Sequence, residues 1–424
     1  MLMGVVADDI TGSNDIGIMF AKAGCLTHVY EYTENLKNPS PDIVILNTNS
    51  RLDSPQEAYQ KVFAATRKLQ AAGCHRFHNK TCSVFRGNIG VEFDAMLDAL
   101  ELDFAVVVLG FPKNGRTTVN GVHYVHGKKL EDSEFRHDPI HPMRRSNLVE
   151  ILQSQTRRKV AALNYEIIEQ GAQRLAESIQ DMRSHCQYLI LDVTDQRALQ
   201  TIAQAVHDET VLCGSSAIAE ELPLVWGIKS LPITKLGLPR MDGLGILITS
   251  GSLMPQTAAQ ITHLQEMGAL IFILDAVQLF EPASRQAEIN ALSKRITAIL
   301  QSGQDVILHS PNQPQQVEAL RQAGLIHGYE KMELSRMISK ALADVTAAVL
   351  TQTGQNRLVV AGGETSAAVC ERLGVTGMRL WQEIQPGLPS CVSLNEPRRL
   401  LVLKSGSFGK PDFFQRALEH LKDQ

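Results

Sequence analysis

The sequence lacks the features that mark secreted, membrane-spanning and nucleic-acid-binding proteins. Its seven cysteines are scattered, odd in number and without a Cys-x-x-Cys pair, which fits reduced thiols rather than a disulfide framework or a zinc site. No apolar run is long enough to cross a bilayer, and the first residues meet Asp8 too early for a signal peptide. A formal net charge of -4 argues against a dedicated nucleic-acid binder. We therefore expect a cytoplasmic protein that binds neither nucleic acid nor membrane.

Common catalytic and nucleotide-binding motifs are also missing. The sequence contains no G-x-x-x-x-G-K-[ST] P-loop and no G-x-G-x-x-G dinucleotide turn. Ser250 and Ser252 lack the G-x-S-x-G context of a nucleophile elbow, and no nucleophilic triad is apparent. Any nucleotide site must therefore belong to a less common class.

The length of 424 residues exceeds one ordinary core and predicts two domains. Short apolar segments alternate with amphipathic helical segments, a pattern that indicates an α/β fold in which each domain has a mostly parallel sheet flanked by helices. A stretch with Pro232 and Pro239 and no periodicity reads as a linker. We predict domains at 1–228 and 244–424 joined by a linker at 229–243. The predicted strands span residues 42–46, 105–109, 159–163 and 188–192 in the first domain, and 245–249, 269–274, 305–309, 357–360 and 400–403 in the second.

The N-terminal segment reads as a strand that ends in Asp8 and Asp9 and then turns into a helix stopped by Gly24. The carboxyl ends of strands are where open α/β sheets bind ligands. Adjacent carboxylates at such a place are costly unless they hold a metal ion or substrate hydroxyls, or take up a proton. The alternative is that one aspartate caps the helix and the other is solvated.

Basic residues occur at or near loops in the first half of the chain. They could converge with the aspartates to grip a small polar acid, with guanidinium groups on its carboxylate, or they could be solvated surface bases. The four bases are Arg51, Lys80, Arg86 and Arg116. Two histidine pairs share a spacing that permits a metal site, but structural or substrate-contacting roles fit better because no acidic or sulfur partner lies nearby. The pairs are His75 with His78 and His123 with His126, the second within a predicted hairpin over 117–130 that turns at 120–121.

Glycine- and serine-rich turns follow three predicted strands of the second half, at residues 250–252, 361–366 and 404–409. Successive backbone N–H groups in such turns can form an anion nest, and helix N-termini add partial positive charge. Lys404 adds a cation beside one of the turns, as a polyphosphate requires. The alternative is that each turn is only a tight strand-to-helix connection.

Taken together, these motifs resemble the four-carbon acid sugar kinase family over essentially the whole chain. The resemblance rests on A-D-D-x-T-G at 7–12, S-R at 50–51, R-G-N-x-G at 86–90, N-G-R-T-T at 114–118, S-G-S at 250–252, G-G-E-T-S at 362–366 and K-S-G-x-F-G at 404–409. It implies an N-terminal domain that binds the sugar acid, a C-terminal domain that binds ATP, and an active site in the interdomain cleft. The family commonly has K-x-D-S-T before R-G-N, whereas Cys82 stands here in place of the acid, which affects the choice among four-carbon acids.

The resemblance leads to a hypothesis for each site. An ATP- and Mg²⁺-dependent enzyme would phosphorylate the 4-hydroxyl of a four-carbon acid, with D-threonate as the first candidate and 3-oxo-tetronate as the second. The expected catalytic residues are Asp9, Asp8 and Arg86. The expected substrate-binding residues are Arg51, Lys80, Ser83, Asn88, Asn114 and Arg116. The expected nucleotide-binding residues are Ser250, Gly251, Ser252, Gly362, Gly363, Glu364, Thr365, Ser366, Lys404 and Gly406.

Other functions stay open from the sequence. A non-catalytic sugar-acid sensor with a regulatory nucleotide site would bind both ligands without turnover. A synthase or aldolase that uses the aspartate pair with a metal ion would consume its substrate without ATP. The sequence does not identify the metal ligands, and it does not divide the roles of Asp8 and Asp9. It does not give the oligomeric state either, although it is compatible with a homodimer.

Overall fold

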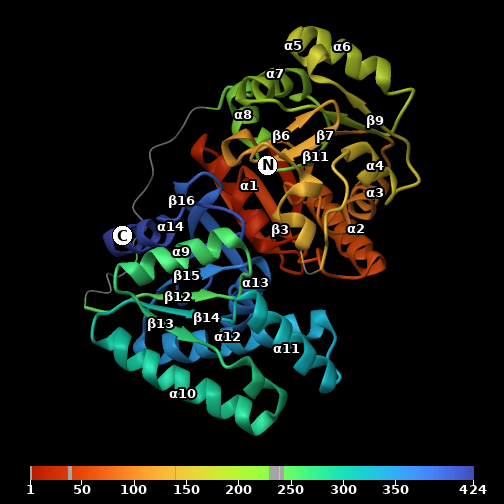
Figure 1. Cartoon of the computed structure of the whole chain (residues 1–424). Helices are drawn as coiled ribbons and strands as arrows, with labels where there is room; N and C mark the ends of the chain where they lie inside the picture. The colour runs from red at the N-terminus through yellow and green to blue at the C-terminus, as the bar shows by residue number, and fades with distance from the viewer. Residues whose placement is uncertain (1, 37–40, 139, 229–237, 239–242) are drawn as a thin grey trace. The chain divides into compact units, whose positions relative to one another are not determined.

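The computed structural model describes residues 2–36, 41–138, 140–228, 238 and 243–424. The chain divides into two compact units, Met1–Pro232 and Ile233–Gln424. Each unit has a mostly parallel sheet with helices on both faces, which confirms the predicted α/β class (Figure 1). The linker predicted at 229–243 lies outside the described residues apart from positions 238 and 243.

The sheet of the first unit is parallel throughout the part that the structure describes. Its central strands are buried on both faces, as expected where helices cover both sides of a parallel sheet. In spatial order its strands are β2 (Thr27–Glu31), β3 (Ile43–Asn47), β1 (Met3–Ala7), β4 (Phe77–Lys80), β11 (Val211–Gly214), β5 (Ala105–Val108), β10 (Tyr188–Leu191) and β9 (Val160–Leu163).

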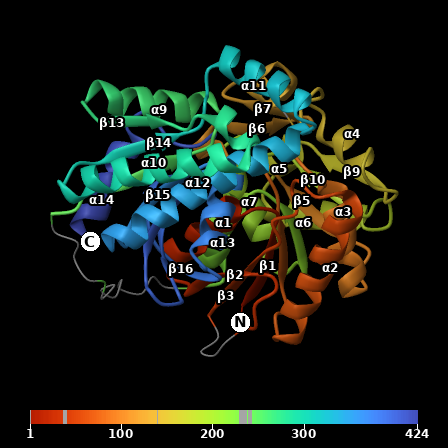
Figure 2. The ribbon, with the colours of Figure 1, turned by 90° about the horizontal axis from the view of Figure 1, so that it is seen from below.

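The strand order reverses direction at β1. The chain leaves β1 through α1 (Ile10–Lys22) toward β2 on one side, and later passes from β3 through α2 (Pro55–Ala71) to β4 on the other side. Helix α1 packs with α8 (Ile218–Val225), whereas α2 packs with α3 (Ile89–Leu100), and α2 and α3 lie side by side in Figures 1 and 2. A reversal of this kind opens a crevice at the carboxyl end of the strand, here directly before Asp8.

The remaining elements of the first unit extend this layering. Helix α2 begins with a capping box between Ser54 and Glu57, and Pro55 occupies its first turn. A small antiparallel sheet carries the predicted hairpin, whose turn at Asn120 and Gly121 has positive φ at both residues. These elements are β6 (Arg116–Val119), β7 (Val122–Val125), β8 (Lys128–Lys129), α4 (Leu148–Gln153), α5 (Tyr165–Glu169), α6 (Ala172–Met182) and α7 (Gln196–Val206).

The second unit combines parallel strands with an antiparallel hairpin at one end of its sheet. The sequence reasoning found the parallel strands and missed the hairpin, β16 and β17. In spatial order the strands are β13 (Leu270–Ile273), β14 (Val306–His309), β12 (Leu247–Ser250), β15 (Arg357–Ala361), β18 (Leu400–Lys404), β17 (Leu388–Ser393) and β16 (Gly377–Gln385).

Helices cover both faces of this second sheet. One face carries α10, α12 and α13, and α10 and α12 run side by side in both views (Figures 1 and 2). The other carries α9 and α14. The helices are α9 (Pro255–Glu266), α10 (Pro282–Gln301), α11 (Pro314–Ile326), α12 (Lys331–Thr353), α13 (Gly363–Arg372) and α14 (Phe413–Asp423). Among the described residues of both units, no helix has the length and apolar character that crossing a membrane requires.

Candidate functional site

The two N-terminal aspartates form one cluster with Arg51 at the carboxyl end of β1. Arg51 donates from Nε and Nη2 to the two carboxylate oxygens of Asp8, both at 2.7 Å, and from Nη1 to Asp9 Oδ2 at 2.6 Å. Asp8 and Asp9 are 1% and 6% exposed. The aspartates and Arg51 thus meet as predicted, but three of the five guanidinium N–H groups are already bonded to carboxylates. Arg51 therefore has little capacity left to bind a substrate carboxylate.

Asp9 also caps helix α1. Its Oδ1 accepts from Gly12 N at 2.6 Å, and its Oδ2 accepts from the Thr11 hydroxyl at 3.0 Å. The capping alternative is therefore correct for Asp9, while Asp8 is buried against Arg51 and not solvated. Burial alone would raise the pKa of Asp9, but Arg51, Lys80 and the cap hydrogen bonds hold it below its ordinary value. A carboxylate with so low a pKa orients a hydroxyl better than it removes its proton.

Lys80 is the last residue of strand β4. Its buried ammonium donates to Thr81 O at 2.9 Å and lies 3.5 Å from Asp15 Oδ2. A Cβ on Gly12 would fall 3.3 Å from Lys80 Nζ and 2.5 Å from Asp9 Oδ1, so both groups lie against this glycine. Lys80 thus stands between Asp9 and Asp15, a helical residue that the sequence reasoning missed.

Arg86 connects Cys82 to a loop that follows the small sheet. Its Nε donates to Cys82 Sγ at 3.3 Å, and its Nη1 donates to Asp138 Oδ2 at 2.6 Å. Burial alone would raise the pKa of the Cys82 thiol, but Arg86 and Arg51 lower it below its ordinary value. Cys82 therefore offers Arg86 a sulfur acceptor at the position where the family pattern has an acid.

The turn that carries Arg51 is held from helix α3. Glu92 Oε1 accepts from the Ser50 hydroxyl at 2.7 Å, and Asn88 Nδ2 donates to Ser50 O at 3.3 Å and to Asp53 O at 2.9 Å. Burial and the nearby Asp8 raise the pKa of Glu92 well above its ordinary value. Asn88 thus supports a loop, and Glu92 is a further buried carboxyl that sequence reasoning missed.

The last expected substrate residues surround the start of β6. Arg116 is 1% exposed, and its Nη1 donates to Asn114 O. The buried Asn114 Nδ2 has no hydrogen-bond partner among the described residues. Ser83, which lies between Lys80 and Arg86 in the sequence, is also buried. His78 and His123 are fully buried, and burial lowers the pKa of each to about 3, so both are neutral near pH 7.

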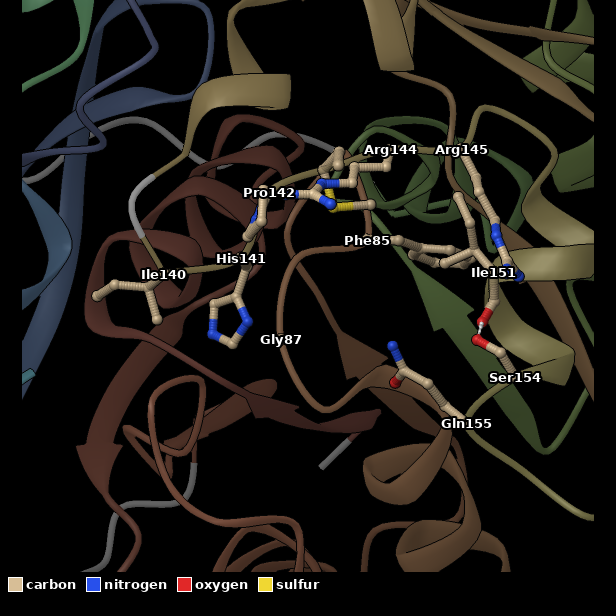
Figure 3. A pocket seen from close by; sticks show the side chains of 11 residues that line it. Phe85, Gly87, Ile140, His141, Pro142, Arg144, Arg145, Ile151, Ser154 and Gln155 are labelled. Atoms are coloured by element: carbon tan, nitrogen blue, oxygen red, sulfur yellow. Dashed lines mark hydrogen bonds between the residues drawn. The ribbon is translucent and has the colours of Figure 1, made fainter. Parts of the chain in front are cut away.

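A cavity of about 370 Å³ lies beside this cluster (Figure 3). Gly87 and His141 line it and also contact Arg51: His141 Nε2 lies 3.1 Å from Arg51 O, and a Cβ on Gly87 would lie 3.1 Å from Arg51 Cγ. Arg144 and Arg145 contribute basic groups to the wall. Neither Asp8 nor Asp9 lines this cavity, so it is not the carboxylate cluster itself.

In the second unit the three glycine-rich turns come together, because β12, β15 and β18 are neighbours in the sheet. A Cβ on Gly251 would collide with the Thr365 hydroxyl, and one on Gly406 would collide with the Ser252 hydroxyl. Thr257 Oγ1 donates to Gly406 O at 2.8 Å. The turns are therefore packed against one another with no room for side chains at these glycines.

Not every amide in these turns is available to a ligand. Gly251 N donates to Ala361 O at 3.2 Å and Gly362 N donates to Lys404 O at 2.9 Å, so the expectation that these two N–H groups bind phosphate does not hold. Gly362, with φ of 109°, is the N-cap of α13, whose first amides belong to Gly363, Glu364 and Thr365. The first amides of a helix have no partner within it and attract anions.

Lys404 lies at the centre of this arrangement and is fully buried. Its ammonium donates to Thr257 Oγ1, Ser405 O and Gly406 O at 2.9, 2.8 and 3.0 Å, and no carboxylate pairs with it in the part of the chain that the structure describes. Burial lowers its pKa well below the ordinary value. Because a trans peptide points its N–H opposite to its C=O, the amides of Gly406 and Ser407 face away from the lysine.

The donor set of the second unit fits a nucleotide phosphate chain. The buried hydroxyls of Ser250 and Ser366 and Glu364 Oε1 have no hydrogen-bond partner among the described residues, and Lys404 supplies a cation. Burial raises the pKa of Glu364, whose other oxygen accepts from Ser335. The described residues contain no group of three or more His, Cys, Asp or Glu side chains that could hold a metal ion by themselves.

Each of the two units matches a known protein family. Residues 3–222 match the sugar-binding N-terminal domain family, and residues 247–414 match the nucleotide-binding C-terminal domain family. The chain is 33% identical to the 3-oxo-tetronate kinase of Cupriavidus necator, with 99% of this chain and 97% of the relative covered. It is 32% identical to the enzyme of the same name from Haemophilus influenzae, over 98% of this chain and 99% of the relative.

Solved structures agree with this assignment. A Haemophilus influenzae protein, 31% identical, has a TM-score of 0.72 over 99% of this chain and 100% of its own. A Salmonella typhimurium LT2 protein described as a tRNA synthase, 29% identical, has a TM-score of 0.82 over 99% of both chains. The chain belongs to the family that joins a sugar-binding N-terminal domain to a nucleotide-binding C-terminal domain, which confirms the four-carbon acid sugar kinase family predicted from the motifs.

Proposed function

We propose that this protein is an ATP-dependent kinase that phosphorylates the terminal 4-hydroxyl of a four-carbon sugar acid. One observation carries the proposal: a buried aspartate–arginine cluster follows the reversal strand of the first unit, and a buried lysine stands among three glycine-rich turns in the second. The names of the relatives favour 3-oxo-tetronate over D-threonate as the acid. The domain limits that we propose remain 1–228 and 244–424, with the linker at 229–243.

Phosphoryl transfer needs positioning and charge neutralisation more than covalent chemistry. Asp9 would orient the attacking hydroxyl, since Oδ1 keeps a lone pair beyond its bond to Gly12 N. Arg51 would fix Asp8 and Asp9 in place. Arg86 would neutralise charge that develops on the transferred group.

The remaining first-unit residues would bind the acid. The carboxylate would meet Lys80, Arg86 and Arg116, while Ser83 and Asn114 offer a hydroxyl and an amide to its hydroxyl groups. Asn88 would act indirectly through the turn that it holds.

The nucleotide phosphates would lie against the first amides of α13 and the amides of Gly406 and Ser407, with the Lys404 charge close by. The hydroxyls of Ser250, Ser252, Thr365 and Ser366 and the small residues Gly251, Gly362 and Gly363 would shape that site. Mg²⁺ typically binds through phosphate oxygens, water and one or two carboxylates, and Glu364 is the carboxylate available here. When bound, the ion would neutralise phosphate charge.

The test is coupled ADP release with Mg-ATP against D- and L-threonate, D- and L-erythronate and the 3-oxo-tetronates, with acid-free ATP hydrolysis as the control. We expect strong turnover on one acid, with 3-oxo-tetronate the best. Tight binding of ATP and an acid without ADP release would replace the kinase with a sensor. Loss of the acid without ATP would indicate a synthase or an aldolase.

A further inference from the structure

A second buried carboxylate stands next to the proposed hydroxyl-binding aspartate. Asp15 lies on α1 and is 3% exposed. Its Oδ2 accepts from the Ser216 hydroxyl at 2.6 Å and lies 3.5 Å from Lys80 Nζ. Its Oδ1 is buried and has no hydrogen-bond partner among the described residues. Burial of Asp15 Oδ1 therefore has a desolvation cost that no hydrogen bond from the described residues offsets.

The Lys80 ammonium is held by few groups. Besides its hydrogen bond to Thr81 O, the ammonium forms an ion pair with Asp15 and with no other carboxylate of the described residues, and it lies against Gly12 beside Asp9. The charge of Lys80 reaches both carboxylates and lowers the pKa of each. The position of this ammonium therefore contributes to the electrostatic field at Asp9, alongside the larger effect of Arg51.

We propose that Asp15 is a positioning residue for phosphoryl transfer: clamped by Ser216, its carboxylate holds the Lys80 ammonium beside Asp9, where the hydroxyl of the acid would bind. This inference rests on the proposed kinase function. Buried ion pairs contribute little net stability, so a costly pair of this kind is better explained by the geometry that it imposes. Without the Asp15 charge, Lys80 is drawn toward Asp9 and competes with the substrate hydroxyl for it.

The clamp depends on the protonation of Asp15. The charged groups that act on it are Lys80 from β4, Asp9 from the start of α1 and Arg116 from β6, and Ser216 after β11 donates to it. Burial raises its pKa to about 6 despite Lys80 and Ser216, which lower it. The carboxylate is ionised near pH 7 and takes up a proton as the pH falls through about 6, which releases Lys80.

The experiment measures kcat against pH for the wild type, Asp15→Asn and Ser216→Ala. In Asp15→Asn, kcat should fall by about 100-fold, the cost of a misplacement of about 1 Å, with KM for ATP unchanged and the acid limb near pH 6 abolished. In Ser216→Ala, the loss of a hydrogen bond that favours the ionised form should move the acid limb to higher pH. If Asp15 and Ser216 served folding alone, the acid limb would stay at its wild-type pH in both variants.

Asp192→Asn is the matched control. Asp192 is also a buried aspartate of the first unit, but within the described part of the chain its carboxylate accepts only from the amides of Asn120, Gly121 and Tyr165. This variant should lose stability and keep the wild-type pH profile. A wild type that phosphorylates no acid would overturn the proposed function. An active wild type whose acid limb survives in Asp15→Asn would overturn the role of Asp15 alone.

Discussion

Lys404→Met tests whether the buried lysine of the second unit supports ATP binding. The lysine is fully buried, and its ammonium has carbonyl and hydroxyl partners but no carboxylate among the described residues. The three N–H groups of the ammonium are all bonded within the protein, so the substitution acts on ATP by releasing the peptides that present the Gly406 and Ser407 amides. Loss of one such amide hydrogen bond to a charged phosphate costs about 1.5–3 kcal/mol, and a tenfold change in affinity corresponds to about 1.4 kcal/mol. The Kd for ATP should therefore rise by roughly 10- to 150-fold in isothermal titration calorimetry.

The same substitution should also change how the stability of the protein depends on pH, because the titrating group is present only in the wild type. Burial lowers the pKa of Lys404 well below its ordinary 10.5, so folding releases a proton between the two values. The stability linked to this group is fully present above about pH 10.5 and is lost as the pH falls through the folded-state pKa. The free energy of unfolding of the wild type, measured by urea titration, should therefore increase relative to that of Lys404→Met as the pH rises from the folded-state pKa to about 10.5.

The control for this prediction is Lys410→Met, which removes the same charge from an exposed lysine close by. It should leave both the ATP affinity and the pH dependence of stability unchanged. The reasoning fails if Lys404→Met binds ATP like the wild type, or if Lys410→Met weakens binding equally.

Three further predictions concern the first unit. Asp9→Asn should lower kcat by at least about 100-fold while ATP affinity stays nearly intact, measured by coupled ADP release and calorimetry; near-wild-type turnover would remove its role. Arg51→Met removes the ion-pair partner of two buried aspartates, Asp8 and Asp9, and should lower the free energy of unfolding by about 3–5 kcal/mol, whereas the exposed Arg174→Met should cost less than about 1 kcal/mol; equal losses in urea unfolding would contradict this. Cys82→Ala should raise KM for the acid and Cys82→Asp should restore it, because Arg86 Nε needs a hydrogen-bond acceptor at this position; identical KM values would show that the thiol is incidental.

The sheets and their covering helices could be predicted from the sequence because parallel strands that are buried on both faces consist of continuous apolar residues. Sequence reasoning located every strand of the second sheet that pairs in parallel. It missed the hairpin of Gly377–Gln385 and Leu388–Ser393, and it missed β4, whose polar residues His78, Asn79 and Lys80 hide a strand. Periodicity does not reveal a strand whose buried positions are occupied by polar side chains that serve a site.

The candidate site could be predicted only in part, for a related reason. Residues just after strand ends, such as Arg51, are visible in the sequence because turns of that kind meet at one edge of a parallel sheet. Asp15 and Glu92 lie inside helices, where a charged residue ordinarily faces solvent, and only the packing of the helix shows that they are buried. An available signal was the Gly-Ser-Ser sequence that begins at Gly214, the last residue of β11, and supplies Ser216.

The most direct test of the central claim is the identity of the product. The protein is incubated with ATP carrying ¹⁸O in its γ-phosphate and with 3-oxo-tetronate, and the acid is then examined by mass spectrometry and ³¹P NMR, with Asp9→Asn as the control. The proposed function predicts a labelled phosphate monoester at the terminal carbon of the acid, formed by the wild type at a far higher rate than by the variant. An acid that stays unlabelled while ATP binds tightly would contradict it.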